Sequence, residues 1–127
     1  MTIVDETATG ESIREFAIPV DSATITLKEV IATRVEEEVR RYNSTLPEFF
    51  NGLVQPTEAE QTLNGYRVKG NRTIDAEKQI YIALAAFQKN GYFVLVDDQQ
   101  VDDLNEEITL KEKSKVSFIK LTPLVGG

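Results

Sequence analysis

The chain has 127 residues, of which 41% are hydrophobic and 28% charged, and its formal net charge is −7. This is the size and composition of one globular domain, and the acidic charge disfavours nucleic acid and anionic membranes as partners. Because the chain has neither cysteine nor histidine, it cannot form disulfides, Ser-His-Asp or Cys-His triads, or zinc sites built on these residues.

The compartment is the next property that the sequence bears on. No apolar run approaches the roughly 20 residues that a membrane-spanning helix needs. The first residues are polar and lack the apolar centre of a signal peptide. We therefore expect a cytoplasmic protein with no membrane or nucleic-acid partner, and with no metal and no cofactor of its own.

The first twenty residues predict a β-hairpin. Residues 2–4 (Thr-Ile-Val) are typical of a short strand, and the Thr/Gly cluster at residues 7–10 is a turn signal. Within residues 12–20, large apolar side chains recur with a period of two at Phe16, Ile18 and Val20, as in a half-buried strand. Pro19 places the end of this strand at or near a sheet edge.

A long helix is predicted after residue 26. Thr26 and Glu29 have the spacing of a capping box, and Asn43-Ser44 is the expected end. Glu36-Glu37-Glu38 is interpreted as a solvated face, because consecutive helical residues point in different directions. Apolar residues recur at helical spacing along the opposite face: Leu27, Val30, Ile31, Val35, Val39 and Tyr42.

The middle of the chain, at about residues 44–91, is treated as an insertion within a single domain of residues 1–127. Residues 56–60 (Pro-Thr-Glu-Ala-Glu) repeat the capping-box pattern and predict a short helix that ends at Asn64-Gly65.

A second long helix is predicted at the end of this insertion. Asp75 is its expected N-cap, and Asn90-Gly91 supplies the residue types that end a helix in left-handed conformation. Core side chains are expected along this helix: Ile80, Tyr81, Leu84 and Phe87.

The last third of the chain predicts two strands and a tail. Residues 92–96 form a continuous apolar run, as in a buried strand, and residues 97–99 (Asp-Asp-Gln) are interpreted as a polar turn rather than a calcium site. Val116 and Phe118 alternate with Ser117 and Ile119 in a last strand, which a tail at about residues 121–127 follows directly. The element order predicts an α+β fold with one mixed sheet and a helix across it.

Both ends of the chain carry a resemblance. Residues 1–10 and the capped helix are similar to the opening of ubiquitin. Residues 93–101 and 116–118 are similar to the last strands of the bacterial sulfur carriers MoaD and ThiS, and residues 123–127 (Pro-Leu-Val-Gly-Gly) to their C-terminus. The chain thus resembles the ubiquitin-like β-grasp superfamily, although residues 113–115 (Lys-Ser-Lys) stand where the carriers usually have a Gly-Asp turn.

The resemblance implies a chemistry for the C-terminus. The carboxylate of Gly127 would be adenylated with ATP by a ThiF/MoeB-type or ubiquitin-activating-type enzyme. A sulfur donor would then give a thiocarboxylate, or a cysteine and later a target lysine would give a conjugate. Gly126 and Gly127 have no side chains, so they fit a narrow passage in such an enzyme. Four further residues would dock the tail as an extended strand: Leu121, Pro123, Leu124 and Val125.

Three classes of function follow. The first is a modifier in a bacterial conjugation-like system, or a sulfur carrier. For a modifier, the resemblance implies a conjugating enzyme, a deconjugating metallopeptidase and target proteins as further partners. The alternative is a non-covalent β-grasp adaptor, in which the sheet binds a partner and the glycines are incidental. An enzyme is disfavoured, because the chain has no catalytic motif and lacks histidine and cysteine; no catalytic residue is expected.

Overall fold

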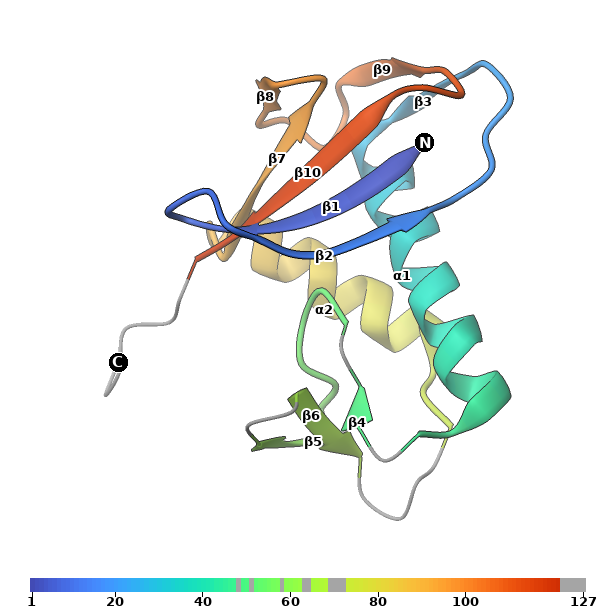
Figure 1. The fold of residues 1–127 in the computed structure, drawn as a ribbon, viewed down its shortest axis with the longest axis vertical. Helices are drawn as coiled ribbons and strands as arrows, with labels where there is room; N and C mark the ends of the chain where they lie inside the picture. The colour runs from blue at the N-terminus through green and yellow to red at the C-terminus, as the bar shows by residue number, and fades with distance from the viewer. Residues whose placement is uncertain (48, 51, 58, 63–64, 69–72, 122–127) are drawn as a thin grey trace. The chain divides into compact units, whose positions relative to one another are not determined.

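A computed structural model describes residues 1–47, 49–50, 52–57, 59–62, 65–68 and 73–121. They form strands and two helices with a mixed sheet, so the expected α+β class is confirmed. The chain divides into two compact units (Figure 1). Unit 1 contains residues 1–30 and the chain from residue 86 onward, and unit 2 contains residues 31–85. Neither helix of the described part is long and apolar enough to cross a membrane.

The main sheet belongs to unit 1 and has the strand order β2-β1-β10-β7-β8. Its strands are β1 (Thr2–Thr7), β2 (Ser12–Ala17), β7 (Tyr92–Val96), β8 (Gln99–Val101) and β10 (Lys115–Lys120). Strands β1 and β10 lie side by side and run parallel, whereas every other neighbouring pair is antiparallel (Figure 1). The first and last strands of the described chain are therefore neighbours inside the sheet.

One face of this sheet supplies the core of unit 1. Residues directly opposite each other in neighbouring strands share a face, and the register pairs Ile3 with Val116 and Phe118 with Val94. All four side chains are fully buried. The predicted last strand, with Val116 and Phe118 facing the core, is confirmed.

The predicted N-terminal hairpin is also confirmed. Strands β1 and β2 are antiparallel, a turn occupies residues 8–10, and β2 forms an edge of the sheet. The second strand ends at Ala17, earlier than the alternation to residue 20 suggested. Beyond it, Ile18 and Met1 exchange two hydrogen bonds, which involve the backbone N–H of Ile18 and the terminal ammonium of Met1.

A second, two-stranded sheet in unit 1 was not predicted. It pairs β3 (Ala23–Thr26) with β9 (Glu107–Leu110) in antiparallel register. Ile25 lies opposite Ile108, and the hydroxyls of Thr24 and Thr109 are 3.2 Å apart. The partner strand lies far along the chain, so residues 23–26 by themselves carry no local signal of this pairing.

The first predicted helix is confirmed as α1 (Leu27–Thr45), which begins in unit 1 and continues into unit 2. The Thr26 hydroxyl oxygen accepts a hydrogen bond from the backbone N–H of Glu29 at 3.2 Å and the hydroxyl donates to the Glu29 carboxylate. The six predicted apolar positions of its inner face, from Leu27 to Tyr42, are all buried.

The interpretation of Glu36-Glu37-Glu38 as a solvated face is wrong at one position. Glu38 is buried and forms an ion pair with Arg34, whose side chain is also fully buried. The i, i+4 spacing brings the two charges together on the inner side of the helix, so each offsets the desolvation of the other. Glu37 instead pairs with Arg40 and Arg41 at the helix surface.

The short helix predicted from residue 56 to Gly65 is wrong. Unit 2 has a three-stranded antiparallel sheet there, in the order β4-β6-β5. Its strands are β4 (Phe49–Phe50), β5 (Ala59–Thr62) and β6 (Gly65–Val68). The backbone φ of Gly65 is 116°, a value that residues other than glycine rarely adopt. This conformation starts the return strand of the β5–β6 hairpin.

The second predicted helix is α2 (Ala76–Gln88). The Asp75 carboxylate accepts hydrogen bonds from the N–H groups of Glu77 and Lys78, so the predicted N-cap is confirmed. The predicted inner face is only partly right. The most buried side chains are Gln79 and Ala83, whereas Tyr81 is 75% exposed and is not a core residue. The described side chains of Ile80, Leu84 and Phe87 are half-buried.

Candidate functional site

The candidate site begins where the last strand ends. Strand β10 is paired over its length with β1 and, from Val116 to Lys120, with β7. At its end, Lys120 lies opposite Thr7 on one side and Tyr92 on the other. A strand that is hydrogen-bonded on both sides is held in place along its whole length. The residue that follows, Leu121, therefore starts from a fixed point.

An ion pair lies at the same end of the strand. The Lys120 ammonium is 3.5 Å from the carboxylate of Asp5 on β1. Asp5 is only 1% exposed, and its register partner on β10 is Phe118, two residues before Lys120. A buried carboxylate needs charged or hydrogen-bonding partners to offset its desolvation, so this contact fixes the Lys120 side chain toward the core side of the sheet.

The backbone at the start of the tail has a contact as well. The N–H of Leu121 donates to the carbonyl of Gly91 at 3.4 Å. Gly91 in turn donates to the carbonyl of Ala86 at 2.8 Å, and Asn90 before it has a φ of 60°. This is the predicted left-handed end of α2, and it is confirmed. A Cβ at Gly91 would lie 3.1 Å from the Ala86 carbonyl oxygen, so a side chain there would crowd the contact.

Of the predicted tail residues, the structure describes Leu121, which is half-buried. Pro123, Leu124, Val125, Gly126 and Gly127 lie outside the described residues. The positions of the activation residues and of most of the docking residues therefore stay predictions. Asp5, Lys120 and Gly91 hold the start of the tail, and this role was not predicted for any of them. The one signal was Asp5 itself, an acid at a core-facing position of a strand that also carries Ile3 and Val4.

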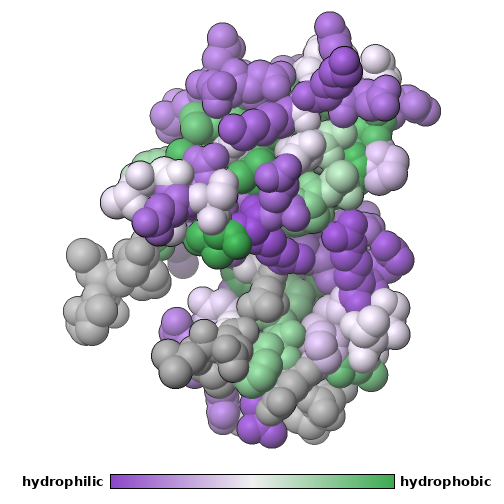
Figure 2. Space-filling view, viewed as in Figure 1, coloured by the Kyte–Doolittle hydropathy of each residue, from purple (hydrophilic) through white to green (hydrophobic). Residues whose placement is uncertain are grey.

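The second face of the main sheet carries a stripe of apolar side chains near the end of β10, where the tail begins. Ile119 lies opposite Phe93, and Leu95 lies opposite Ser117, so these side chains share the face opposite to that of Ile3, Val94, Val116 and Phe118. Ile119, Phe93 and Leu95 are half-buried. Figure 2 shows hydrophobic atoms among the hydrophilic ones on the side of unit 1 turned to the viewer. We call Phe93, Leu95 and Ile119 the sheet stripe.

Several carboxylates of unit 1 lie in polar turns or ion pairs. Asp97 and Asp98 form the β7–β8 turn with φ values of 47° and 69°. The Asp97 carboxylate accepts the N–H of Lys115 at 3.0 Å, and Lys115 itself lies 4.0 Å from Glu6. Within the described ranges, no group of three or more Asp and Glu side chains is placed to hold a metal ion.

Comparison of the chain with protein-family models, with curated proteins and with solved structures finds no match.

Proposed function

We propose that this chain is a ubiquitin-like β-grasp protein whose C-terminal Gly126-Gly127 is activated by ATP-dependent adenylation. The observation that carries the proposal is the parallel pairing of β1 with β10, with β2 and β7 on their outer sides. A β-grasp sheet has this arrangement, in which the N-terminal hairpin and the last strand meet at the centre. The strand order therefore favours the resemblance that the chain ends suggested.

The chemistry of the tail follows from its place after β10. A carboxylate is a poor electrophile until it is converted to an acyl adenylate, so the Gly127 carboxylate must enter the active site of a second protein. The strand pairing, the Lys120–Asp5 ion pair and the Leu121–Gly91 hydrogen bond hold the start of the tail on unit 1. This anchoring supports a tail that is presented from a fixed origin, which lowers the entropic cost of ordering it in a partner.

The sheet stripe supports a docking surface for the activating enzyme. Phe93, Leu95 and Ile119 are half-buried apolar side chains near the start of the tail. Leu121 is two residues after Ile119, so the alternation of an extended chain places it on the same side. Burying such a stripe contributes about 25 cal/mol per Å² of apolar area. The net charge of −7 favours an adenylating enzyme, of the ThiF/MoeB or ubiquitin-activating type, that offers a basic rim around an apolar centre.

Within this function, a modifier is favoured over a sulfur carrier. Unit 2 contains most of α1, most of α2 and a three-stranded sheet, so the chain is larger than a minimal carrier domain. The proposal includes conjugation of Gly127 to a target lysine, in a bacterial cytoplasmic system with a conjugating enzyme and a deconjugating metallopeptidase. The chain itself is not an enzyme in this account.

A non-covalent adaptor is the second candidate, and the sheet stripe is the observation that favours it. An apolar strip on an otherwise charged surface is typical of protein interfaces, whether or not a covalent step follows. In that case partner binding depends on Phe93, Leu95 and Ile119 and is indifferent to the terminal glycines.

The two candidates are separated by the intact mass of the protein isolated from its own cells with an antibody. An N-terminal tag is avoided, because the Met1 ammonium donates hydrogen bonds to Ile18 and Glu112. The activation account predicts either the mass difference of sulfur for oxygen or an adduct linked to a lysine of another protein. Either modification should be lost when Gly127 is deleted and should be kept in the surface variant Asp102→Asn. If the wild type and the deletion variant show the same unmodified mass and the same bound partners, the adaptor is the function.

A further inference from the structure

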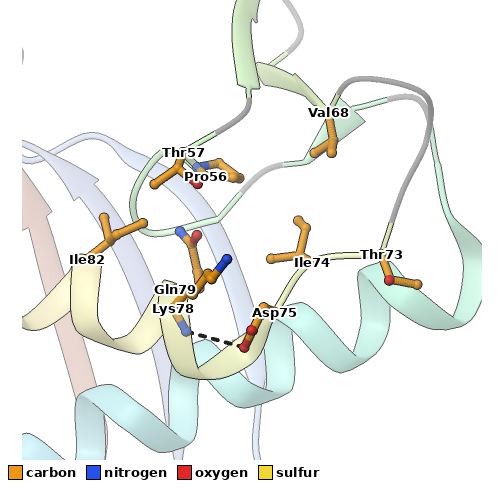
Figure 3. Close-up of a pocket in the computed structure, with 9 residues that line it drawn as sticks. All are labelled: Pro56, Thr57, Val68, Thr73, Ile74, Asp75, Lys78, Gln79 and Ile82. Carbon is orange, nitrogen blue, oxygen red and sulfur yellow. Dashed lines mark hydrogen bonds between the residues drawn. The ribbon is translucent and has the colours of Figure 1, made fainter.

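Unit 2 has a pocket of about 130 Å³, and all of its lining residues are described. Figure 3 shows it between the loop before β5, the end of β6 and the first turns of α2. Its aliphatic wall consists of Pro56, Val68, Ile74 and Ile82. Its polar lining consists of Thr57, Thr73, Asp75, Lys78 and Gln79. None of the tail or stripe residues of the proposed function belongs to it.

Hydrogen bonds from side chains to the backbone hold the walls of this pocket in place. The buried Gln79 side chain donates to the carbonyl of Val54 at 2.8 Å, which ties the loop before β5 to α2. On the opposite side, Asn43 accepts from the N–H of Ile74 and donates to its carbonyl. A hollow whose walls are fixed in this way keeps its shape without an occupant, as binding pockets usually do.

The size of the pocket limits what it can hold. Cofactor- and drug-sized sites measure about 300–1,000 Å³. A cavity of about 150 Å³ holds one benzene ring. The pocket at α2 is close to the second value, so it is too small to enclose a nucleotide, whereas a branched aliphatic group of about four to six carbons fits.

The charged side chains at the pocket indicate which polar group a ligand would carry. The carboxylate of Asp75 accepts the N–H groups of Glu77 and Lys78 at 2.9 and 3.4 Å, so it is engaged by the first turn of α2 (Figure 3). The Lys78 ammonium forms no ion pair with any residue of the described part of the chain. Lys78 is the only cation among the described residues that line the pocket. A cation beside an aliphatic wall favours a carboxylate that carries an apolar body.

We propose that this pocket binds a small aliphatic carboxylate, with the branched body against Ile74, Val68 and Ile82 and the carboxylate at Lys78. The group can be a free short-chain acid or the carboxyl-terminal residue of a protein that ends in leucine or valine. A ligand of this size binds with a Kd on the order of 1–10 mM, because few atoms contribute.

The test is a chemical-shift titration of the full-length, ¹⁵N-labelled chain with isovalerate. Isovaleramide has the same shape without the charge, and acetate has the charge without the aliphatic body. A peptide that ends in leucine, and its carboxamide form, distinguish a protein terminus from a free acid. The variant Lys78→Gln removes the cation at an exposed position, and Lys89→Gln is the matched control.

We expect isovalerate to shift the amide signals of Thr73, Ile74 and Lys78 with saturation, and isovaleramide and acetate to bind at least about fivefold more weakly. Lys78→Gln should lower the affinity for isovalerate by a similar factor, and Lys89→Gln should leave that affinity unchanged. Tighter binding of the leucine-ended peptide than of isovalerate assigns the site to a protein terminus, and weaker binding assigns it to a free acid. The proposal would be overturned by shifts that do not saturate with isovalerate. It would also be overturned if isovaleramide bound as tightly as isovalerate, or if Lys78→Gln bound isovalerate as tightly as the wild type.

Discussion

Asn43 and Ile74 are joined by two hydrogen bonds between one side chain and one backbone unit. The Asn43 amide nitrogen donates to the Ile74 carbonyl at 2.9 Å, and the Ile74 N–H donates to the Asn43 amide oxygen at 2.8 Å. The Asn43 side chain thus pairs with both backbone groups of Ile74, as a neighbouring β-strand would. This contact connects the last turns of α1 with the segment before α2, and Ile74 packs against the cluster of Tyr42, Phe50 and Val68.

Replacing Asn43 by alanine should destabilise unit 2. Both backbone groups of Ile74 lose their partner in a part-buried position, so we expect the free energy of unfolding to fall by about 1–3 kcal/mol. Urea denaturation measures this change. Asn105→Ala, at an exposed asparagine of unit 1, should change stability by less than about 0.5 kcal/mol. Equal effects of the two substitutions would show that the Asn43–Ile74 contact does not stabilise the fold.

The hydroxyl of Tyr42 gives a second prediction. It is buried without a hydrogen-bond partner among the described residues, and burial raises the pKa of Tyr42. The ring packs edge-on against Phe50 with the centroids 5.5 Å apart. Because Phe keeps the ring and removes the unpaired group, Tyr42→Phe should leave stability unchanged or raise it by about 1 kcal/mol.

Thermal or urea unfolding measures this effect, and Tyr42→Ala is the contrast. The alanine variant removes the ring as well and should lose about 3–5 kcal/mol. A loss above about 1 kcal/mol in the phenylalanine variant would mean that the hydroxyl has a partner that stabilises the native state.

Glu37 gives a pH-dependent prediction. Its hydrogen bond to Arg40, with a further one to Arg41, lowers its pKa from 4.5 to about 2. A lowered pKa in the native state stabilises the protein above the unfolded value, and this stabilisation is lost as the pH falls from about 4.5 toward about 2. The Arg40 side chain is largely exposed and that of Arg41 is partly exposed, so solvent screens both pairs and we expect only about 0.5–1 kcal/mol.

The measurement is the difference in unfolding free energy between the wild type and Glu37→Gln, followed from pH 6 to pH 2. The wild type should be the more stable at pH 6, and the difference should shrink as Glu37 is protonated. The exposed Glu36→Gln variant is the control. A difference that stays constant over this range would contradict the assignment of the effect to the Glu37 charge.

The sheet stripe gives a prediction on activity. If Ile119 docks the adenylating enzyme, Ile119→Ser should raise the KM for this chain in ATP–pyrophosphate exchange by about tenfold and leave kcat unchanged. Ile13→Ser is the matched control, because Ile13 is 58% exposed on the edge strand β2, outside the stripe. Circular dichroism confirms that both variants are folded. An unchanged KM for Ile119→Ser would remove the stripe from the docking surface.

Local signals in the sequence were sufficient for part of this fold. The Thr26–Glu29 capping box, the Asp75 cap and the left-handed stop at Asn90 each depend on residues within a few positions of one another. The apolar run of β7 is also a local signal. Such features are set by backbone hydrogen bonding and side-chain periodicity, which a single sequence displays directly.

The errors arose where a distant partner decides the outcome. Residues 59–62 follow a good capping pattern, yet they pair with β6 because Gly65 starts a return strand. Gln79 is buried because its amide meets the Val54 carbonyl, so the inner face of α2 is centred on Gln79 and Ala83 rather than on the more apolar Ile80. For the site, the start of the tail is held by Asp5 and Gly91, whose proximity to Lys120 and Leu121 depends on strand pairing.

The most direct test of the central claim is tandem mass spectrometry of the C-terminal tryptic peptide from the protein isolated from its own cells. Lys120 is the last basic residue, so trypsin releases residues 121–127 as one peptide. If Gly127 is activated as proposed, part of this peptide carries Gly127 as a thiocarboxylate or in an isopeptide bond to a lysine of another protein. Recovery of the peptide only as the free acid, under conditions in which linked forms of a control conjugate are detected, would contradict it.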